Sequence, residues 1–287
     1  MNSTAPFRVL LAIVFGCFLG SVTIHAAVQA PPQQAGGYKL VFDDEFNSFD
    51  LARNGDGPHT WYPGIWFNHK PTPLSNVFVS SSILSLVWRA GQGSDATSIS
   101  TLSHDAQYFR AWRYGYFEAR MRWNVVNGAW PSFWLIPVQD ATGKAVYDGV
   151  RRTGEIDVFE GMGDEPHTFY GTLHEWINFH SAPVSDNAFH LAPNIDLSQF
   201  HTYGLLWVPG RVTWYIDNKP LRSEETPGIF DVQDFFLVLG MQEGRDWTLG
   251  NRDDVSAQAI SMEVDWVRVW QLLPQSRNLF GRLAGNR

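Results

Sequence analysis

Three carboxylates lie within six residues of one another, Glu155, Asp157 and Glu160, and Ile, Val and Phe separate them. The β-branched and aromatic spacers are typical of a strand. In a regular strand the side chains at positions i and i+2 share a face, so Glu155 and Asp157 point the same way. Glu160 has the opposite parity. One extra residue, at Val158 or Phe159, would form a β-bulge and turn Glu160 onto the acidic face.

Carboxylates packed this closely repel one another, and the segment from 154 to 161 contains no lysine or arginine. Such repulsion pushes neighbouring pKa values apart, which separates an ionised nucleophile from a protonated acid. The alternative is a solvated outer strand. The apolar spacers favour a strand with one face in the core and only acids on the other, and hence a catalytic site.

The pattern resembles the E-I-D-x-x-E signature of glycoside hydrolase family 16 in its bulged form. That family includes laminarinases, lichenases, agarases and carrageenases. The resemblance implies a retaining endo-glycosidase: Glu155 is the nucleophile, Glu160 is the general acid and then the base, and Asp157 hydrogen-bonds Glu155. Strand geometry separates the glutamate backbones by roughly 13 Å. The side chains could narrow this to the ~5–5.5 Å of a retaining pair or leave the wider inverting gap.

Motifs of the same family recur from about Tyr38 to Gln271. They include Tyr114–Met121, Gly128–Leu135, Gly171–His174, Phe200–Trp207, Val212–Asp217 and Val264–Trp270. On an extended chain Trp130 and Trp134 share a face, and flat amphipathic rings bind the apolar faces of sugars. The alternative is that both tryptophans are core residues, but the resemblance places them beside the acidic strand as a sugar platform.

The resemblance also implies substrate-contact or site roles for Asn76 and His174. Asn76 occupies a position where asparagine contacts a sugar hydroxyl, although as a bare residue it is a turn former. His174 would reach the acid/base carboxylate. The run Leu239–Trp247 departs from the family pattern, and Gln242 there would reshape one side of the cleft together with Met241.

Glu45 and Asp265 lie where many members of the family bind a structural calcium ion, for which oxygen ligands are suited. The histidines do not have the spacing of a catalytic zinc site such as H-E-x-x-H. We therefore expect no cofactor to be required for catalysis, with calcium as a possible structural ion.

The segments outside the motifs set the domain organisation. Residues 1–26 are typical of a secretory signal peptide, and the only cysteine, Cys17, lies within them. We predict a flexible lead-in over 27–37, a catalytic domain over 38–272 and a disordered tail over 273–287. The exported chain would then have no disulfide bond.

Short apolar segments separated by turn residues favour an all-β fold, a β-sandwich or jelly roll of two antiparallel sheets with a concave substrate cleft. Residues 50–75 have no clear period and are expected to form a long loop. We predict strands over residues 38–42, 76–79, 83–88, 97–102, 115–124, 132–136, 154–160, 167–174, 201–208, 211–217, 235–241 and 262–271.

The net charge of −8 and the lack of a basic stripe argue against nucleic acid or an anionic polysaccharide as the partner. The expected function is a secreted, extracellular or periplasmic enzyme that hydrolyses β-1,3- or mixed β-1,3/1,4-glucan. We expect a monomer with no membrane attachment after signal removal. The alternatives are a non-catalytic sugar-binding jelly roll, a family 16 enzyme acting on a galactan, and a transglycosylase.

Overall fold

The computed structural model describes residues 31, 33, 36–65, 72–92, 96–141, 146–147, 149–163, 165–183, 187–244 and 259–272. The predicted signal peptide and the predicted tail lie outside the described residues, as does most of the predicted lead-in. Within the described part of the chain, no helix is long and apolar enough to cross a membrane.

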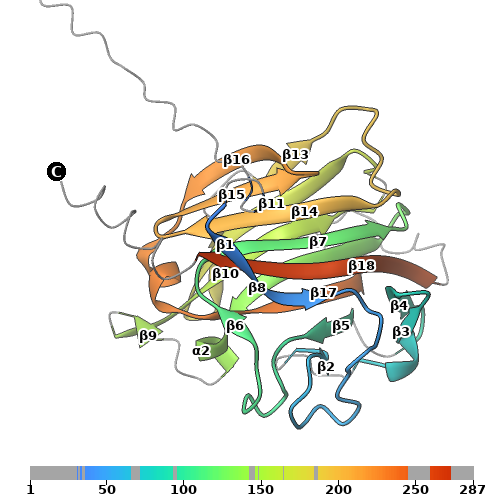
Figure 1. The fold of residues 1–287 in the computed structure, drawn as a ribbon, viewed down its shortest axis with the longest axis horizontal. Coiled ribbons are helices and arrows are strands. Elements are labelled where there is room, and N and C mark those ends of the chain that lie inside the picture. Colours follow the sequence, from blue (N-terminus) through green and yellow to red (C-terminus); the bar gives the residue numbers. More distant parts are fainter. Residues whose placement is uncertain are drawn as a thin grey trace, which may run out of the picture.

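Two antiparallel sheets form the molecule, and Figure 1 shows them as two stacked layers. The first, named here the β7 sheet, has eight strands. In spatial order these are β16 (Lys219–Glu225), β15 (Arg211–Ile216), β14 (His201–Val208), β7 (Gly115–Trp123), β18 (Ala259–Leu272), β4 (Ile83–Arg89) and β3 (Val77–Ser80), with β1 (Tyr38–Asp44) paired to β18.

The second sheet, named here the β10 sheet, has ten strands. The main order is β12 (His180–Pro183), β11 (Thr168–Ile177), β10 (Val150–Gly161), β8 (Ala129–Pro137), β17 (Phe235–Glu243), β5 (Ala96–Ser100) and β2 (Tyr62–Pro63). Three short strands join it at the side, β13 (Ala188–His190), β6 (Ala111–Trp112) and β9 (Val146–Tyr147). The helical segments are short: η1 (Leu74–Asn76), α2 (Val138–Ala141) and η2 (Gly228–Val232).

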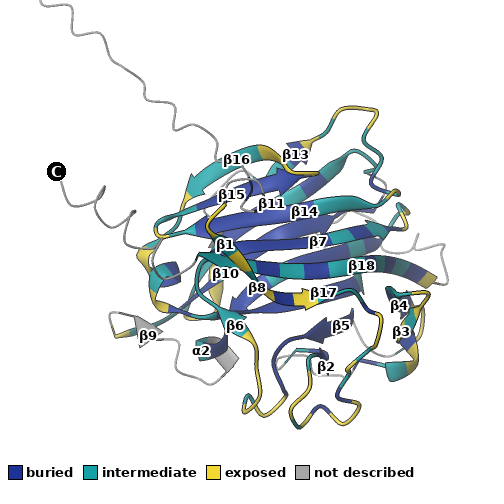
Figure 2. Cartoon of the chain, viewed as in Figure 1, coloured by how far each residue is buried: buried dark blue, intermediate teal, exposed yellow. Residues whose placement is uncertain are grey.

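The core lies between the sheets, because each strand directs its apolar side chains to the facing layer. Phe117, Trp207 and Val267 from the β7 sheet are fully buried with Leu135 and Ile156 from the β10 sheet, in one hydrophobic cluster. Figure 2 shows the buried residues concentrated on the central strands, including β7, β14 and β10. The central strands of the β10 sheet therefore pack with one face against the β7 sheet.

The predicted all-β sandwich is confirmed, and each predicted strand is present with shifts of a few residues at its ends. Residues 50–65 are more structured than a plain loop. Asp50 accepts hydrogen bonds from the Thr60 N–H and hydroxyl, and its Oδ1 lies 2.6 Å from His59 Nδ1. The sequence pattern gave no sign of these contacts because they depend on side chains that bridge the segment. Residues 66–71 lie outside the described part.

Candidate active site

Glu155, Asp157 and Glu160 all line one recess of about 250 Å³ on the β10 sheet. The face of β10 that carries them is opposite to the face that packs Ile156 into the core. Side chains from β5, β8, β11 and β17 complete the recess, and they include Ser98, Trp130, Ser132, Trp134, Trp176 and Gln242.

A β-bulge brings Glu160 onto this face, as predicted. On the β11 side, three steps along β10 from Asp157 to Glu160 match only two steps along β11, from Thr172 to Tyr170. On the β8 side the register shifts between Asp157 and Phe159, which lie opposite the adjacent residues Trp134 and Phe133. The extra residue is therefore Val158.

Glycine at the end of this segment allows close packing of the layers. A Cβ atom on Gly161 would lie 2.7 Å from the Pro131 ring and 2.9 Å from the Trp123 indole. Contacts this short require neighbouring atoms to move, and both rings are packed. Gly161 thus lets the end of β10, directly after Glu160, lie flat against its neighbours.

Glu155 and Glu160 each accept a hydrogen bond from a tryptophan indole N–H. Trp176 Nε1 donates to Glu155 Oε2 at 2.9 Å, and Trp130 Nε1 donates to Glu160 Oε1 at 2.9 Å. Hydrogen bonds to a carboxylate are stronger than those between neutral groups and fix its orientation. Both glutamates are therefore held at one oxygen.

Asp157 lies between the glutamates and is 3% exposed. Its Oδ2 is 3.2 Å from His174 Nε2, and His174 Nδ1 is 2.8 Å from Ser181 Oγ on β12. With the proton on Nε2 facing Asp157, Nδ1 accepts from the Ser181 hydroxyl. The sequence prediction that His174 belongs to the site is consistent with this position, although its carboxylate neighbour is Asp157 rather than the acid/base candidate.

Burial raises the pKa of all three acids. For Glu155, burial acts together with repulsion from Asp157, while His174 and the Trp176 hydrogen bond act in the opposite direction. Burial raises the pKa of Asp157 as well. Burial and repulsion from Asp157 raise the pKa of Glu160 to about 8, against the Trp130 hydrogen bond. A carboxyl group with such a pKa is protonated at neutral pH and can act as an acid.

Two of the other predicted site residues, Trp134 and Gln242, line the recess. Gln242 on β17 lies opposite Trp130 on the neighbouring strand β8. Met241, the residue before it, is fully buried in the core cluster. The prediction that both Met241 and Gln242 shape the cleft is therefore supported only for Gln242. The remainder of that segment, from residue 245, lies outside the described residues.

Asn76 does not line the recess and is 3% exposed. Its Nδ2 donates to Gln92 Oε1 at 2.8 Å, and its Oδ1 accepts from Arg89 Nε at 3.2 Å. The amide is thus used within the protein, and the structure gives no support to the predicted sugar contact.

Glu45 and Asp265 each face an arginine. Arg268 donates to Glu45, and Arg120 Nη1 lies 2.5 Å from Asp265 Oδ2. A calcium ion takes six to eight oxygen ligands and would compete with both guanidinium groups. These two side chains, as they stand, do not fit a calcium site. Among the described residues, the only cluster of three potential metal ligands is Glu155, Asp157 and His174, whose ligand atoms lie within 4.8 Å of one another.

Sequence reasoning missed Trp176 and Ser181. Trp176 follows His174 by two residues, so the period of a strand places both on one face, with their rings 5.9 Å apart. That spacing could have identified Trp176. Ser181 carried no signal, because its contact depends on the pairing of β12 with β11.

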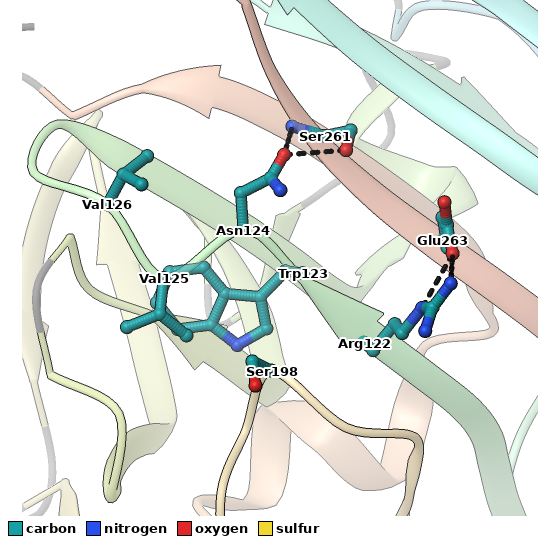
Figure 3. A pocket seen from close by; sticks show the side chains of 8 residues that line it. All are labelled: Arg122, Trp123, Asn124, Val125, Val126, Ser198, Ser261 and Glu263. Atoms are coloured by element: carbon teal, nitrogen blue, oxygen red, sulfur yellow. Dashed lines mark hydrogen bonds and ion pairs between the residues drawn. The ribbon is translucent and has the colours of Figure 1, made fainter. Parts of the chain in front are cut away.

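A second recess, of about 390 Å³, lies at one end of β7 and β18. Figure 3 shows its polar and charged side chains directed at each other: Arg122 pairs with Glu263 at 2.6 Å, and Asn124 Oδ1 accepts hydrogen bonds from the Ser261 N–H and hydroxyl. These groups satisfy one another and present no pair of free carboxylates. The recess on the β10 sheet is therefore the candidate active site.

Comparison with known proteins identifies the family of this chain. The family model "Glycosyl hydrolases family 16" matches residues 78–268. The endo-1,3-1,4-beta-glycanase ExsH of Rhizobium meliloti is 28% identical over 294 residues, which cover 88% of this chain and 58% of that protein. The beta-glucanase of Rhodothermus marinus is 27% identical over 281 residues, covering 91% of this chain and 93% of that one.

The chain spans 58% and 51% of the length of two Rhizobium meliloti glycanases. Among solved structures, the laminarinase catalytic domain of Thermotoga maritima superposes with a TM-score of 0.66 at 24% identity. That superposition covers 83% of this chain and all of the other. At this level of identity the likeness concerns the fold.

Proposed function

Because this chain belongs to glycosyl hydrolase family 16, we propose that it is a retaining endo-glycosidase that hydrolyses β-1,3- or mixed β-1,3/1,4-glucan. The observation that carries the proposal is the bulge at Val158, which brings Glu160 into the recess that Glu155 and Asp157 also line. A non-catalytic sugar-binding sheet would need the tryptophans of this recess but not three converging acids.

In the proposed mechanism, Glu155 attacks the anomeric carbon while Glu160 gives its proton to the departing glycosidic oxygen. The sugar is then bound to Glu155 as an ester. Glu160, now ionised, takes a proton from water, and the resulting hydroxide oxygen displaces Glu155 from the sugar. The raised pKa of Glu160 suits the first half of this cycle, because the group begins protonated.

Asp157 would allow Glu155 to remain ionised. Two adjacent carboxyl groups share one proton more readily than they ionise together. Asp157 is the more deeply buried of the two, whereas Glu155 is partly exposed and bonded to Trp176. The proton therefore favours Asp157, which can donate it as a hydrogen bond to Glu155.

The glucan assignment is supported by two of the relatives, the endo-1,3-1,4-beta-glycanase of Rhizobium meliloti and the beta-glucanase of Rhodothermus marinus. The net charge of −8 disfavours sulfated galactans, because each sulfate would be repelled. We further propose that the protein is secreted, that residues 38–272 are its catalytic domain, and that it acts as a monomer without a cofactor.

The proposal is tested with laminarin, lichenan, agarose and κ-carrageenan, using reducing-sugar release and product sizing. We expect medium-length oligosaccharides from laminarin or lichenan, and NMR that shows the β-anomer as the first product. Binding of glucan without any released reducing sugar would indicate a binding module instead. An α-anomer formed first would contradict retention, and products longer than the substrate would indicate transglycosylation.

A further inference from the structure

The two proposed catalytic glutamates each accept an indole N–H from a different neighbouring strand. Trp176 on β11 donates to Glu155 Oε2, and Trp130 on β8 donates to Glu160 Oε1. Building on the proposed function, we propose that Trp176 and Trp130 are positioning residues that select which oxygen of each glutamate reacts.

The pairing of the strands places both tryptophans in the same relationship to their glutamates. His174 is the residue opposite Glu155, and Trp176 lies two positions farther along β11. Ser132 is opposite Glu160, and Trp130 lies two positions away along β8. Residues on such a diagonal share a face and lie within reach of an aromatic side chain. The two contacts therefore follow from strand register.

An indole N–H is a donor only, so the oxygen that it contacts must keep a lone pair for it. For Glu155, Oε2 is committed to Trp176, which leaves Oε1 as the attacking oxygen. For Glu160, Oε1 is committed to Trp130, so the proton is carried on Oε2.

This assignment defines both steps by atom. Glu155 Oε1 forms a bond to the anomeric carbon as the glycosidic C–O bond breaks, and the departing oxygen takes the proton from Glu160 Oε2. In the second step water loses a proton to Glu160 Oε2. The water oxygen bonds to the anomeric carbon while its bond to Glu155 Oε1 breaks.

The two tryptophans should differ in which substrates need them. Trp176 acts on the nucleophile, so every substrate depends on it. Trp130 acts on the acid, which matters for formation of the glycosyl-enzyme only where the leaving group needs a proton. A purely structural role would not produce this difference.

The experiment replaces each tryptophan separately with β-(3-benzothienyl)alanine, which keeps the bicyclic shape and removes the N–H. Phenylalanine substitutions serve as second variants. The rate of glycosyl-enzyme formation is measured with a dinitrophenyl β-glucoside oligosaccharide, whose leaving group needs no proton, and with the phenyl analogue, whose leaving group does. Trp266→Phe is the matched control, because Trp266 lies on β18 of the other sheet beneath Arg268.

Loss of the N–H at position 176 should slow this step by about 10- to 100-fold with both leaving groups, as expected for a hydrogen bond to a charged group. The acidic limb of the kcat/KM profile should move to higher pH. Loss of the N–H at position 130 should slow glycosyl-enzyme formation by a similar factor only with the phenyl leaving group. The basic limb of the kcat/KM profile should then move to higher pH. Trp266→Phe should leave both rates and both limbs unchanged.

Equal losses with both leaving groups at both positions, with unmoved limbs, would show that the tryptophans only support the fold and would overturn the proposal. Wild-type rates in the position 176 variant would also overturn it. If wild-type protein forms no glycosyl-enzyme with either glucoside and cleaves no polysaccharide, the proposed function fails, and this assignment fails with it.

Discussion

Glu155 and Glu160 point into the same recess although five positions separate them, a spacing that directs side chains of a regular strand to opposite faces. Val158, the extra residue between them, changes the parity. The bulge therefore converts a strand whose alternate side chains pack the core into one that presents both glutamate carboxyl groups to a single recess.

Replacement of Glu155 by glutamine should abolish turnover with little change in fold, because the amide cannot act as a nucleophile. We expect initial rates on the preferred glucan to fall by about 10⁴-fold or more. Glu175→Gln is the matched control, since Glu175 lies on β11 and pairs with Arg152 at 3.3 Å. A rate near that of the wild type for Glu155→Gln would refute the nucleophile assignment.

Stability should decrease as pH rises through the range in which Glu160 ionises. The native state holds the proton up to a pKa of about 8, against the ordinary value of 4.5. The folded protein thus binds more protons than the unfolded chain between these values, and unfolding becomes easier as pH rises through them. We expect the Tm to fall between pH 5 and pH 8.

Glu160→Gln removes the Glu160 contribution to this proton linkage, so its Tm at pH 8 should exceed that of the wild type by several degrees, and the difference should shrink towards pH 5. About 1 kcal/mol corresponds to roughly 2–4 °C in a domain of this size. The exposed Glu225→Gln serves as control and should follow the wild-type profile. If the Tm of Glu160→Gln changed with pH in parallel with that of the wild type, Glu160 would ionise with an ordinary pKa.

Ser181→Ala should reduce kcat/KM by about fivefold, the effect expected for loss of one neutral hydrogen bond of about 1 kcal/mol. The Ser181 hydroxyl hydrogen-bonds to His174 Nδ1 and so favours the tautomer with its proton on Nε2, which faces Asp157. Without that hydroxyl, His174 loses this preference. Thr168→Ala removes a similar hydroxyl–imidazole contact, to His190, and should not affect the rate. Equal rates for both variants would exclude a role for Ser181.

Gly161→Ala should destabilise the protein by about 1–3 kcal/mol, because the added methyl group would overlap the Pro131 and Trp123 rings. Turnover should fall as well, since Glu160 is the preceding residue. Urea denaturation measures the first effect. Gly240→Ala is the comparison: its Cβ would meet the Ser132 hydroxyl at 2.9 Å, a small group that can rotate. Equal destabilisation of the two variants would contradict this account.

The acidic motif was readable from the sequence because parity and apolar spacers depend only on local order. The choice between Val158 and Phe159 as the bulged residue was not, since it is fixed by pairing with β8 and β11. The same limit explains Asn76, whose partner Gln92 is 16 residues away. It also explains Glu45, whose arginine partner lies 223 residues farther along the chain. The family resemblance assigned roles to Asn76 and Glu45, but it could not predict which side chains of this chain they contact.

The side chains that contact Glu155 and Asp157, Trp176 and His174, lie near the edge of the β10 sheet. Ser181 lies on β12, which among the described strands pairs only with β11, and the same hairpin carries His174 and Trp176. Edge hairpins open locally at lower free energy than central strands. On gentle heating, the enzyme should therefore lose activity through fraying of this hairpin while the central sandwich is still intact, and amide hydrogen exchange should be fastest there.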